Sequence, residues 1–311
     1  MTRSARFVYR SLCSGAVMLA ASGLAIPPAQ AKPLPANAKN SVVLCTCDPS
    51  NVDFTDSNAV GNIWIGSEDG GGFSGSGSGT ITGSVDFAQP NIGQYSPDGI
   101  AVTGGAIYNN ANVAADLDAV IMASQTFSTE PGTTLDIIGG DSVNASSGMM
   151  DSAGNEVFTA AIDPEVGFAA GTTFTIDGTS NQSVVINIPS TGGQEFDGSV
   201  VLTGGITADE VLFNFDSGNY DTGTGGDTLI MDSVDPNPIT TGTFLDPNGA
   251  IEITDFDIYG RLFGGDSLGI QITGSDLYDP VPEPTSLVLL GAGLAGLGAI
   301  RRRRRRPFLR S

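Results

Sequence analysis

Short runs of alternating apolar and polar residues, separated by glycine, dominate the chain from residue 61 to residue 280. In Gly61–Gly66 (GNIWIG) and Gly79–Ala88 (GTITGSVDFA), apolar side chains recur at every second position and turn residues close each run. A period of two places successive side chains on opposite faces of a strand, so the pattern predicts many short β-strands. The intervals between the runs show no fixed repeat. We therefore expect a mainly β fold, an irregular β-solenoid, with a β-sandwich as the alternative.

The length of the patterned region fits one large β domain at residues 61–280, preceded by a leader segment at residues 32–60. The stretch Gly70–Gly79 is rich in glycine and serine, and we interpret it as a loop within this domain because alternation resumes directly after it. Further strands are expected at 133–138, 172–176, 183–188, 199–202, 210–215, 228–231, 242–245, 250–254, 257–263 and 267–273.

One segment, residues 112–127, breaks the β pattern because it contains neither glycine nor proline and its apolar positions follow a helical stripe. Asn112 can cap its amino-terminal end, and Asp116 and Asp118 lie near the positive end of the helix dipole. Pro131 and Gly132 bound the segment on the far side. The sequence therefore predicts one helix of about four turns in an otherwise β chain.

The beginning of the chain has the three parts of a secretory signal peptide. The first ten residues hold three arginines and no acid, and an apolar run, Leu12–Ile26, follows and ends at two prolines. Ala29 and Ala31 then supply the small residues that precede a cleavage point. Residues 1–31 are therefore expected to be removed on export, which would leave Lys32 as the first residue.

The end of the chain, residues 281–311, also has three parts. Val281, Pro282, Glu283 and Pro284 form a stiff element, because a proline disfavours a helical conformation of the residue before it. Residues 285–300 carry no charge, and six arginines follow at 301–306. As a helix, 285–300 would be about 24 Å long, slightly less than the roughly 30 Å of a bilayer core. The arginines would stay cytoplasmic and leave the body of the chain outside the inner membrane.

These three parts, in this order at the end of the chain, resemble the PEP-CTERM sorting signal of Gram-negative bacteria. The resemblance implies recognition and cleavage near Pro282-Glu283-Pro284 by an exosortase, which is a membrane protease. It also implies a precursor held transiently in the inner membrane through 285–300, and a mature protein at the cell surface or in the extracellular matrix.

A second resemblance covers most of the body. The helical segment is followed by four characteristic stretches: Ser183–Ile188 (SVVINI), Val211–Phe215 (VLFNF), Thr241–Ala250 (TGTFLDPNGA) and Ile258–Ser267 (IYGRLFGGDS). This order resembles the choice-of-anchor A family of exported bacterial domains, and it is similar to bacterial ice-binding proteins, which pack one long helix along a β-solenoid. The resemblance implies surface display and brings no catalytic residues.

The charge of the body limits its partners. Residues 32–280 contain only three basic residues, Lys32, Lys39 and Arg261, but all except one of the thirty-four acids, so their net charge is about −30. Such a body repels nucleic acid and anionic lipid surfaces. The charge therefore disfavours nucleic acid as a partner. An exopolysaccharide or surface glycan remains as a candidate partner, beside the exosortase that the resemblance to the sorting signal implies.

The residues of this body form no recognisable catalytic site. There is no histidine in the chain, which rules out histidine-based catalysis and metal ligation. Acid pairs such as Asp209-Glu210 and Asp255/Asp257 are expected by chance in so acidic a chain. We therefore expect a non-enzymatic protein without a cofactor.

Only two cysteines, Cys45 and Cys47, remain after removal of the leader. Positions i and i+2 of a strand share a face, so the two thiols can lie side by side and form a local disulfide after export. Whether they are oxidised stays open at this point.

Two further groups of residues suggest ligands. Asp216, Asp221 and Asp227 lie in an acidic, glycine-rich loop and are weak candidates for calcium, which takes six to eight oxygen ligands. Their spacing matches no EF-hand, and we interpret the loop as a solvated turn with no metal. Thr80/Thr82 and Thr173/Thr175 are Thr-x-Thr pairs as on ice-binding faces, but threonine is also an ordinary strand residue.

The sequence thus favours an exported protein of the cell surface or extracellular matrix with a structural or adhesive role. Ice binding or calcium-dependent glycan binding is the alternative. The ligand of the β-rich domain does not follow from the sequence.

Processing at both ends is the first testable prediction. We expect cleavage after Ala31 and again near Pro282-Glu283-Pro284, because each end carries its own signal. Intact-mass spectrometry of the exported protein should show both ends trimmed. A mature protein that still contains residues 301–306 would contradict the sorting half of this prediction.

Overall fold

The structure is a computed structural model that describes residues 34, 36–47, 50–66, 70–90, 94–137, 142–161, 167–189, 193–216, 228–233, 238–265 and 269–280. The signal peptide 1–31 and the sorting tail 281–311, with the expected membrane helix 285–300, lie outside these residues. Within the described part, no helix is long and apolar enough to cross a membrane.

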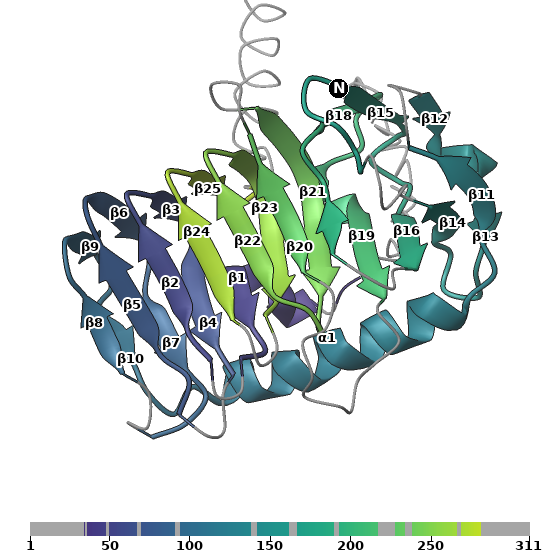
Figure 1. The fold of residues 1–311 in the computed structure, drawn as a ribbon. Helices are drawn as coiled ribbons and strands as arrows, with labels where there is room; N and C mark the ends of the chain where they lie inside the picture. Colours follow the sequence, from purple (N-terminus) through teal and green to yellow (C-terminus); the bar gives the residue numbers. More distant parts are fainter. Residues whose placement is uncertain are drawn as a thin grey trace, which may run out of the picture.

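The strands stack in parallel into the three faces of a β-solenoid (Figure 1). Face A consists, in spatial order, of β10 (Ala106–Ile107), β7 (Val85–Phe87), β4 (Asn62–Ile65), β1 (Ser41–Cys45), β23 (Asp257–Gly264), β21 (Ile239–Asp246), β19 (Val211–Asp216), β16 (Val184–Pro189), β14 (Glu156–Ala161) and β11 (Thr133–Asp136). Face B consists of β17 (Gln194–Glu195), β20 (Leu229–Asp232), β22 (Ile251–Thr254), β24 (Ile270–Thr273), β2 (Val52–Thr55), β5 (Phe73–Ser76) and β8 (Tyr95–Pro97).

Face C is built from short strands and from the first halves of two long ones. At one end lie β12 (Ser142–Asn144), β15 (Thr173–Asp177) and β18 (Ser199–Thr203). The first halves of β21 and β23 come next, because these strands bend from face C into face A. The face then continues through β25 (Asp276–Tyr278), β3 (Asn58–Val60), β6 (Gly79–Thr82) and β9 (Ile100–Val102). A short strand, β13 (Met149–Met150), adds an antiparallel partner to β14.

The chain does not wind from one end of the solenoid to the other. Its first coil, β1–β2–β3, lies in the middle, and the next coils extend to the end formed by β8, β9 and β10. Helix α1 (Ala111–Thr129) then runs back along face A, as Figure 1 shows, and β11 to β25 wind from the opposite end toward the middle. There the last coil pairs with the first through β23–β1, β24–β2 and β25–β3. We call this junction the seam.

The expected fold, a mainly β solenoid with one long helix, is confirmed. The predicted strands correspond to β11, β15, β16 and β18 to β24. Residues 41–60, assigned from the sequence to the leader segment, form the coil β1–β2–β3.

The expected loop at Gly70–Gly79 was wrong, because Phe73–Ser76 form β5, which lies between β2 and β8 in face B. Gly75 fits there for lack of a side chain, since a Cβ would lie 2.9 Å from Ile100.

Tight corners between faces B and C keep the coils in register. Asp56 (φ 48°), Gly77 (φ 76°), Asp255 (φ 51°) and Gly274 (φ 63°) occupy this corner in four neighbouring coils, all in the left-handed region that glycine and aspartate tolerate best. The Asp56 carboxylate accepts a hydrogen bond from the amide of Ser78, which is 22 residues later in the next coil (2.8 Å). Corners of one type therefore stack on one another.

The solenoid has two apolar layers. Inside the coils lies a phenylalanine-rich core in which Phe213 and Phe244 stack with ring centroids 5.1 Å apart. The outward side chains of face A, such as Leu44 and Trp64, form a second layer beneath α1. Both sides of face A strands such as β1 and β16 are therefore buried, which explains their continuous apolar runs.

Helix α1 begins and ends close to the prediction of 112–127, but its N-cap is Asn110 rather than Asn112. The Asn110 side chain accepts from the amide of Asn112 at 3.1 Å. A buried polar ladder fixes the helix on face A: Ser124 donates to Asn214 (2.6 Å), Asn214 donates to Asn187 (3.0 Å), and Asn187 donates to the carbonyl of Phe127 (2.6 Å). These hydrogen bonds are satisfied at only one position of the helix along the sheet.

The close approach of neighbouring coils gives a stability prediction. A Cβ at Gly260 would lie 1.7 Å from the carbonyl oxygen of Gly242, so Gly260→Ala should lower the free energy of unfolding by at least about 3 kcal/mol. Gly193→Ala is the control, because its nearest atom would be 3.7 Å away. Gly193→Ala should change the free energy of unfolding, measured by denaturant unfolding, by no more than about 0.5 kcal/mol. Equal effects of the two substitutions would contradict the packing argument.

Candidate functional site

The three faces differ in what covers them. Helix α1 covers face A, whereas in the described part of the chain no element packs over the outward side of face B or face C. Face B is one parallel sheet, whereas face C consists of the separate sheet β12–β15–β18 and of a second parallel stretch that runs from β21 to β9. Within each stretch, the outward side chains repeat at the strand spacing of roughly 4.8 Å. Faces B and C are the surfaces on which a ligand can lie.

Face C carries half of the exposed large hydrophobic side chains among the described residues. These are Val60 (39 % exposed), Val201 (41 %), Tyr259 (43 %) and Ile239 (48 %). Tyr278, half-buried, lies between Tyr259 and Val60 in the cross-strand register. We name these five residues the C strip.

Two tyrosines form the centre of the C strip. The rings of Tyr259 and Tyr278 stack with centroids 4.6 Å apart and planes 20° apart. The Tyr278 hydroxyl donates to Asp276 (3.0 Å), whose other carboxylate oxygen accepts from Asn58 (2.8 Å). The hydrogen bond to Asp276, together with burial and nearby negative charge, raises the pKa of Tyr278 to about 12. The ring pair is therefore held in place by polar neighbours.

Face B presents hydroxyl groups and acids instead. One outward row consists of Asp232, Thr254, Thr273, Thr55 and Ser76, paired strand by strand, and the hydroxyls of Thr55 and Ser76 are 2.8 Å apart. We name Thr254, Thr273, Thr55 and Ser76 the hydroxyl row. The neighbouring row contains three carboxylates, Glu195, Glu252 and Asp53.

The sequence analysis missed both the C strip and the hydroxyl row. Their members come from opposite ends of the chain and become neighbours only at the seam. Each strand contributes one threonine or serine to the hydroxyl row, so a search for Thr-x-Thr pairs does not find it. Thr80/Thr82 and Thr173/Thr175 lie on β6 and β15 of face C, and their cross-strand partners do not extend them into a threonine array. One signal was present, since coils β2–β3 and β5–β6 repeat with a spacing of 21 to 22 residues.

The other residues singled out from the sequence have structural roles or lie outside the description. Asp209 pairs with Arg261, and Glu210 accepts from the amide of Thr207 (2.8 Å). Asp255 forms a left-handed corner, and Asp257 accepts from the amide of Asp276 (3.1 Å). For the calcium candidates, Asp221 and Asp227 lie outside the described residues, as does the side chain of Asp216. In the described ranges, no group of three acidic, cysteine or histidine side chains could hold a metal ion.

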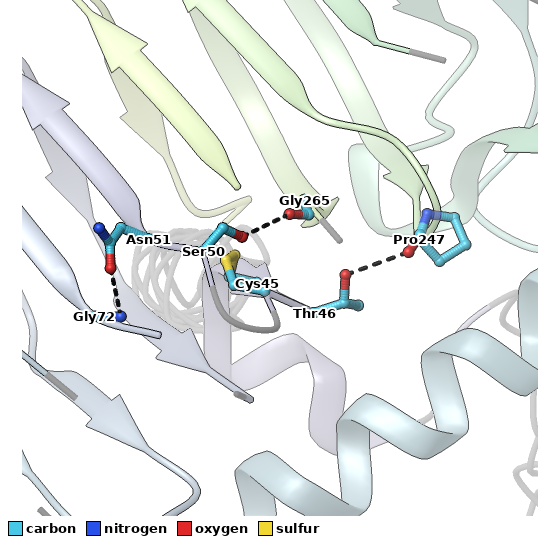
Figure 2. The surroundings of a disulfide bond; sticks show 8 residues. Cys45, Thr46, Ser50, Asn51, Gly72, Pro247 and Gly265 are labelled. Atoms are coloured by element: carbon cyan, nitrogen blue, oxygen red, sulfur yellow. Dashed lines mark hydrogen bonds between the residues drawn. A yellow bond between two sulfur atoms is a disulfide. The ribbon is translucent and has the colours of Figure 1, made fainter. Parts of the chain in front are cut away.

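Cys45 and Cys47 form a disulfide bond with Cα atoms 5.1 Å apart (Figure 2). Both residues are fully buried where β1 leaves face A. Thr46 between them donates to the carbonyl of Pro247 (3.3 Å), and nearby Ser50 donates to that of Gly265 (3.4 Å). The disulfide thus lies at the seam and has a structural position.

Comparison with known proteins identifies the tail and the fold. Residues 280–305 match the PEP-CTERM protein-sorting motif, which confirms the sorting signal expected at the end of the chain. Such a motif implies an exported protein that an exosortase processes. No curated protein matches the chain, and the resemblance to the choice-of-anchor A family stays a prediction.

Solved structures of similar fold are ice-binding proteins. One is from the Antarctic ascomycete Antarctomyces psychrotrophicus (14 % identity, 82 % of this chain and 100 % of that chain, TM-score 0.51). Another is from an Antarctic bacterium of the Flavobacteriaceae (16 % identity, 80 % of this chain, TM-score 0.49), and the present chain spans 47 % of its length. The Shewanella frigidimarina ice-binding protein_1 DUF3494 domain matches with 11 % identity over 79 % of this chain and 97 % of that chain (TM-score 0.44). At these identities the likeness concerns the fold.

The tyrosine pair gives a prediction on pH. Because the folded state raises the pKa of Tyr278 from 10.0 to about 12, its stabilising contribution is complete below pH 10 and is lost as the pH rises through 12. Asp276→Asn removes the main cause and should move this ionisation toward pH 10. Tyrosinate absorbance during alkaline titration measures the shift, and Tyr278→Phe identifies the step. An unchanged titration in Asp276→Asn would refute the assigned cause.

Proposed function

We propose that this chain is a non-enzymatic protein of the cell surface or extracellular matrix, sorted by an exosortase, with a structural or adhesive role. The sorting motif at 280–305 and the signal peptide support export and processing. The strongly acidic body favours solubility among secreted polymers. Acid pairs considered for catalysis are engaged in structural contacts, which supports the non-enzymatic assignment.

The observation that carries the adhesive role is the C strip. It combines aliphatic and aromatic side chains with the amide, hydroxyl and carboxylate groups of Asn58, Thr80 and Asp276 on an uncovered sheet. Tyrosines offer apolar surface together with a polar end, and an extended glycan chain has the same mixed character. The net charge near −30 disfavours anionic polymers. An uncharged polysaccharide is therefore the partner that fits best.

Ice binding is the second candidate, because the hydroxyl row places threonines at regular strand spacing on a fold shared with an ice-binding protein. The adjacent carboxylates Glu252 and Asp53 interrupt this regular surface with strongly hydrated charges. This neighbouring acid row is the reason that we place ice binding second. The calcium-dependent form of glycan binding rests on the sequence of the 216–227 loop alone.

A crossed experiment separates the two candidates. Residues 32–280 are tested on a neutral-glycan array and in an ice-recrystallisation assay, together with Tyr259→Ala on face C and Thr273→Tyr on face B. We expect glycan binding that Tyr259→Ala weakens about tenfold, or roughly 1.4 kcal/mol, and that Thr273→Tyr leaves unchanged. Equal thermal unfolding of the variants serves as the folding control.

The opposite pattern would favour the second candidate. Inhibition of ice recrystallisation that is lost in Thr273→Tyr and kept in Tyr259→Ala would make ice binding the function. Loss of glycan binding in both variants, or in neither, would contradict the assignment to the C strip.

A further inference from the structure

The last strand of the fold lies directly before the sorting motif. β25 ends at Tyr278, the amide of Asp279 donates to the carbonyl of Val60 (2.9 Å), and the motif match begins at residue 280. Leu277 is 1 % exposed in the solenoid core. No linker segment therefore separates the docked strand from the motif.

Arg261 ties both ends of the folded body together at this point. Its Nε and Nη2 donate to the carbonyls of Ser41 and Lys39, each at 3.1 Å, at the beginning of the first coil. Nη2 also donates to Asp279 (2.5 Å), and Nη1 pairs with Asp209. Arg261 is 4 % exposed, so these contacts replace water around a buried charge. Asp279 is thereby fixed from both its main chain and its side chain.

The chain length beyond this contact is short. Residues 280–284 separate Asp279 from the uncharged segment that begins at Thr285. Five extended residues reach about 17 Å. A protease that binds its substrate through main-chain hydrogen bonds needs an extended peptide whose main chain has no other partner. On the amino-terminal side of Pro282, however, the main chain is already paired with β23 and β3.

We propose that the docked strand β25 restricts the sorting protease, so that the rate of cleavage follows the release of this strand from the seam. This inference rests on the proposed sorting by an exosortase. When a segment opens and closes faster than it is cut, proteolysis tracks the population of the open form. The hydrogen bonds of β25 and the Arg261–Asp279 pair lower that population. The edge between faces C and A, marked by Lys39, Asn62 and Asp279, is then the surface that faces the protease.

The test uses the full-length precursor in cells that contain an exosortase, with pulse-chase measurement of precursor and mature protein. A flexible ten-residue glycine-serine insertion between Pro280 and Val281 leaves the body unchanged and frees the motif from β25. We expect it to increase the cleavage rate at least threefold. Asp279→Asn weakens the contact with Arg261 and should act in the same direction. The matched control, Glu252→Gln, removes one carboxylate from face B and should cleave at the wild-type rate.

Each outcome decides the inference. A cleavage rate that is unchanged or lower with the insertion overturns it, and so does an equal increase in Glu252→Gln. If Asp279→Asn impairs folding, the insertion alone decides, because it alters no residue of the body. Failure of sorting itself is distinguishable: the wild type would then stay uncleaved, as Glu283→Ala is expected to do, and this inference would fall with it.

Discussion

The pairing of the first coil with the last is the contact on which the rest of the structure depends. Hydrogen bonds across the seam join residues more than 200 positions apart, such as Thr46 to Pro247 and Arg261 to Ser41. Neither half of the chain can bury the adjoining apolar side chains alone, because each half supplies one side of the junction. Closing so long a loop is slow and costs entropy, so we expect the seam to form late in folding.

Helix α1 makes this arrangement possible. After β10 the chain stands at one end of the solenoid, and the next strand, β11, lies at the other end, so one element has to span the whole length. A helix does this with its own main-chain hydrogen bonds satisfied, and it buries the outward layer of face A at the same time. The ladder of Ser124, Asn214 and Asn187 holds it in register. Covering face A in this way leaves faces B and C as the only uncovered sheets among the described residues.

Local signals in the sequence were sufficient for much of the fold. Alternation identified strands such as β16, and the absence of glycine and proline identified α1, because both patterns depend on neighbours within a few residues. The N-cap was predicted at Asn112, two positions after the observed cap Asn110, because helix ends are the part of a helix that the sequence defines least well. The strand β5 was missed because its glycine, Gly75, serves close packing between coils, which no local pattern reveals. The C strip and the hydroxyl row were out of reach for the same reason: Val60 and Tyr278 become neighbours only through the seam.

The position of the chain ends decides which face a bound partner meets. Lys39 and Asp279 are both held by Arg261, at the edge where faces C and A join. In a three-faced body this edge lies opposite face B. In a precursor held in the membrane through residues 285–300, as the resemblance to the sorting signal implies, a connection of at most about 17 Å would keep the C strip near the cell and direct the hydroxyl row outward. A glycan of the same cell would meet face C first, and anything arriving from outside would meet face B. The proposed cleavage would remove this difference, so the timing of processing would also determine when the two faces become equally accessible.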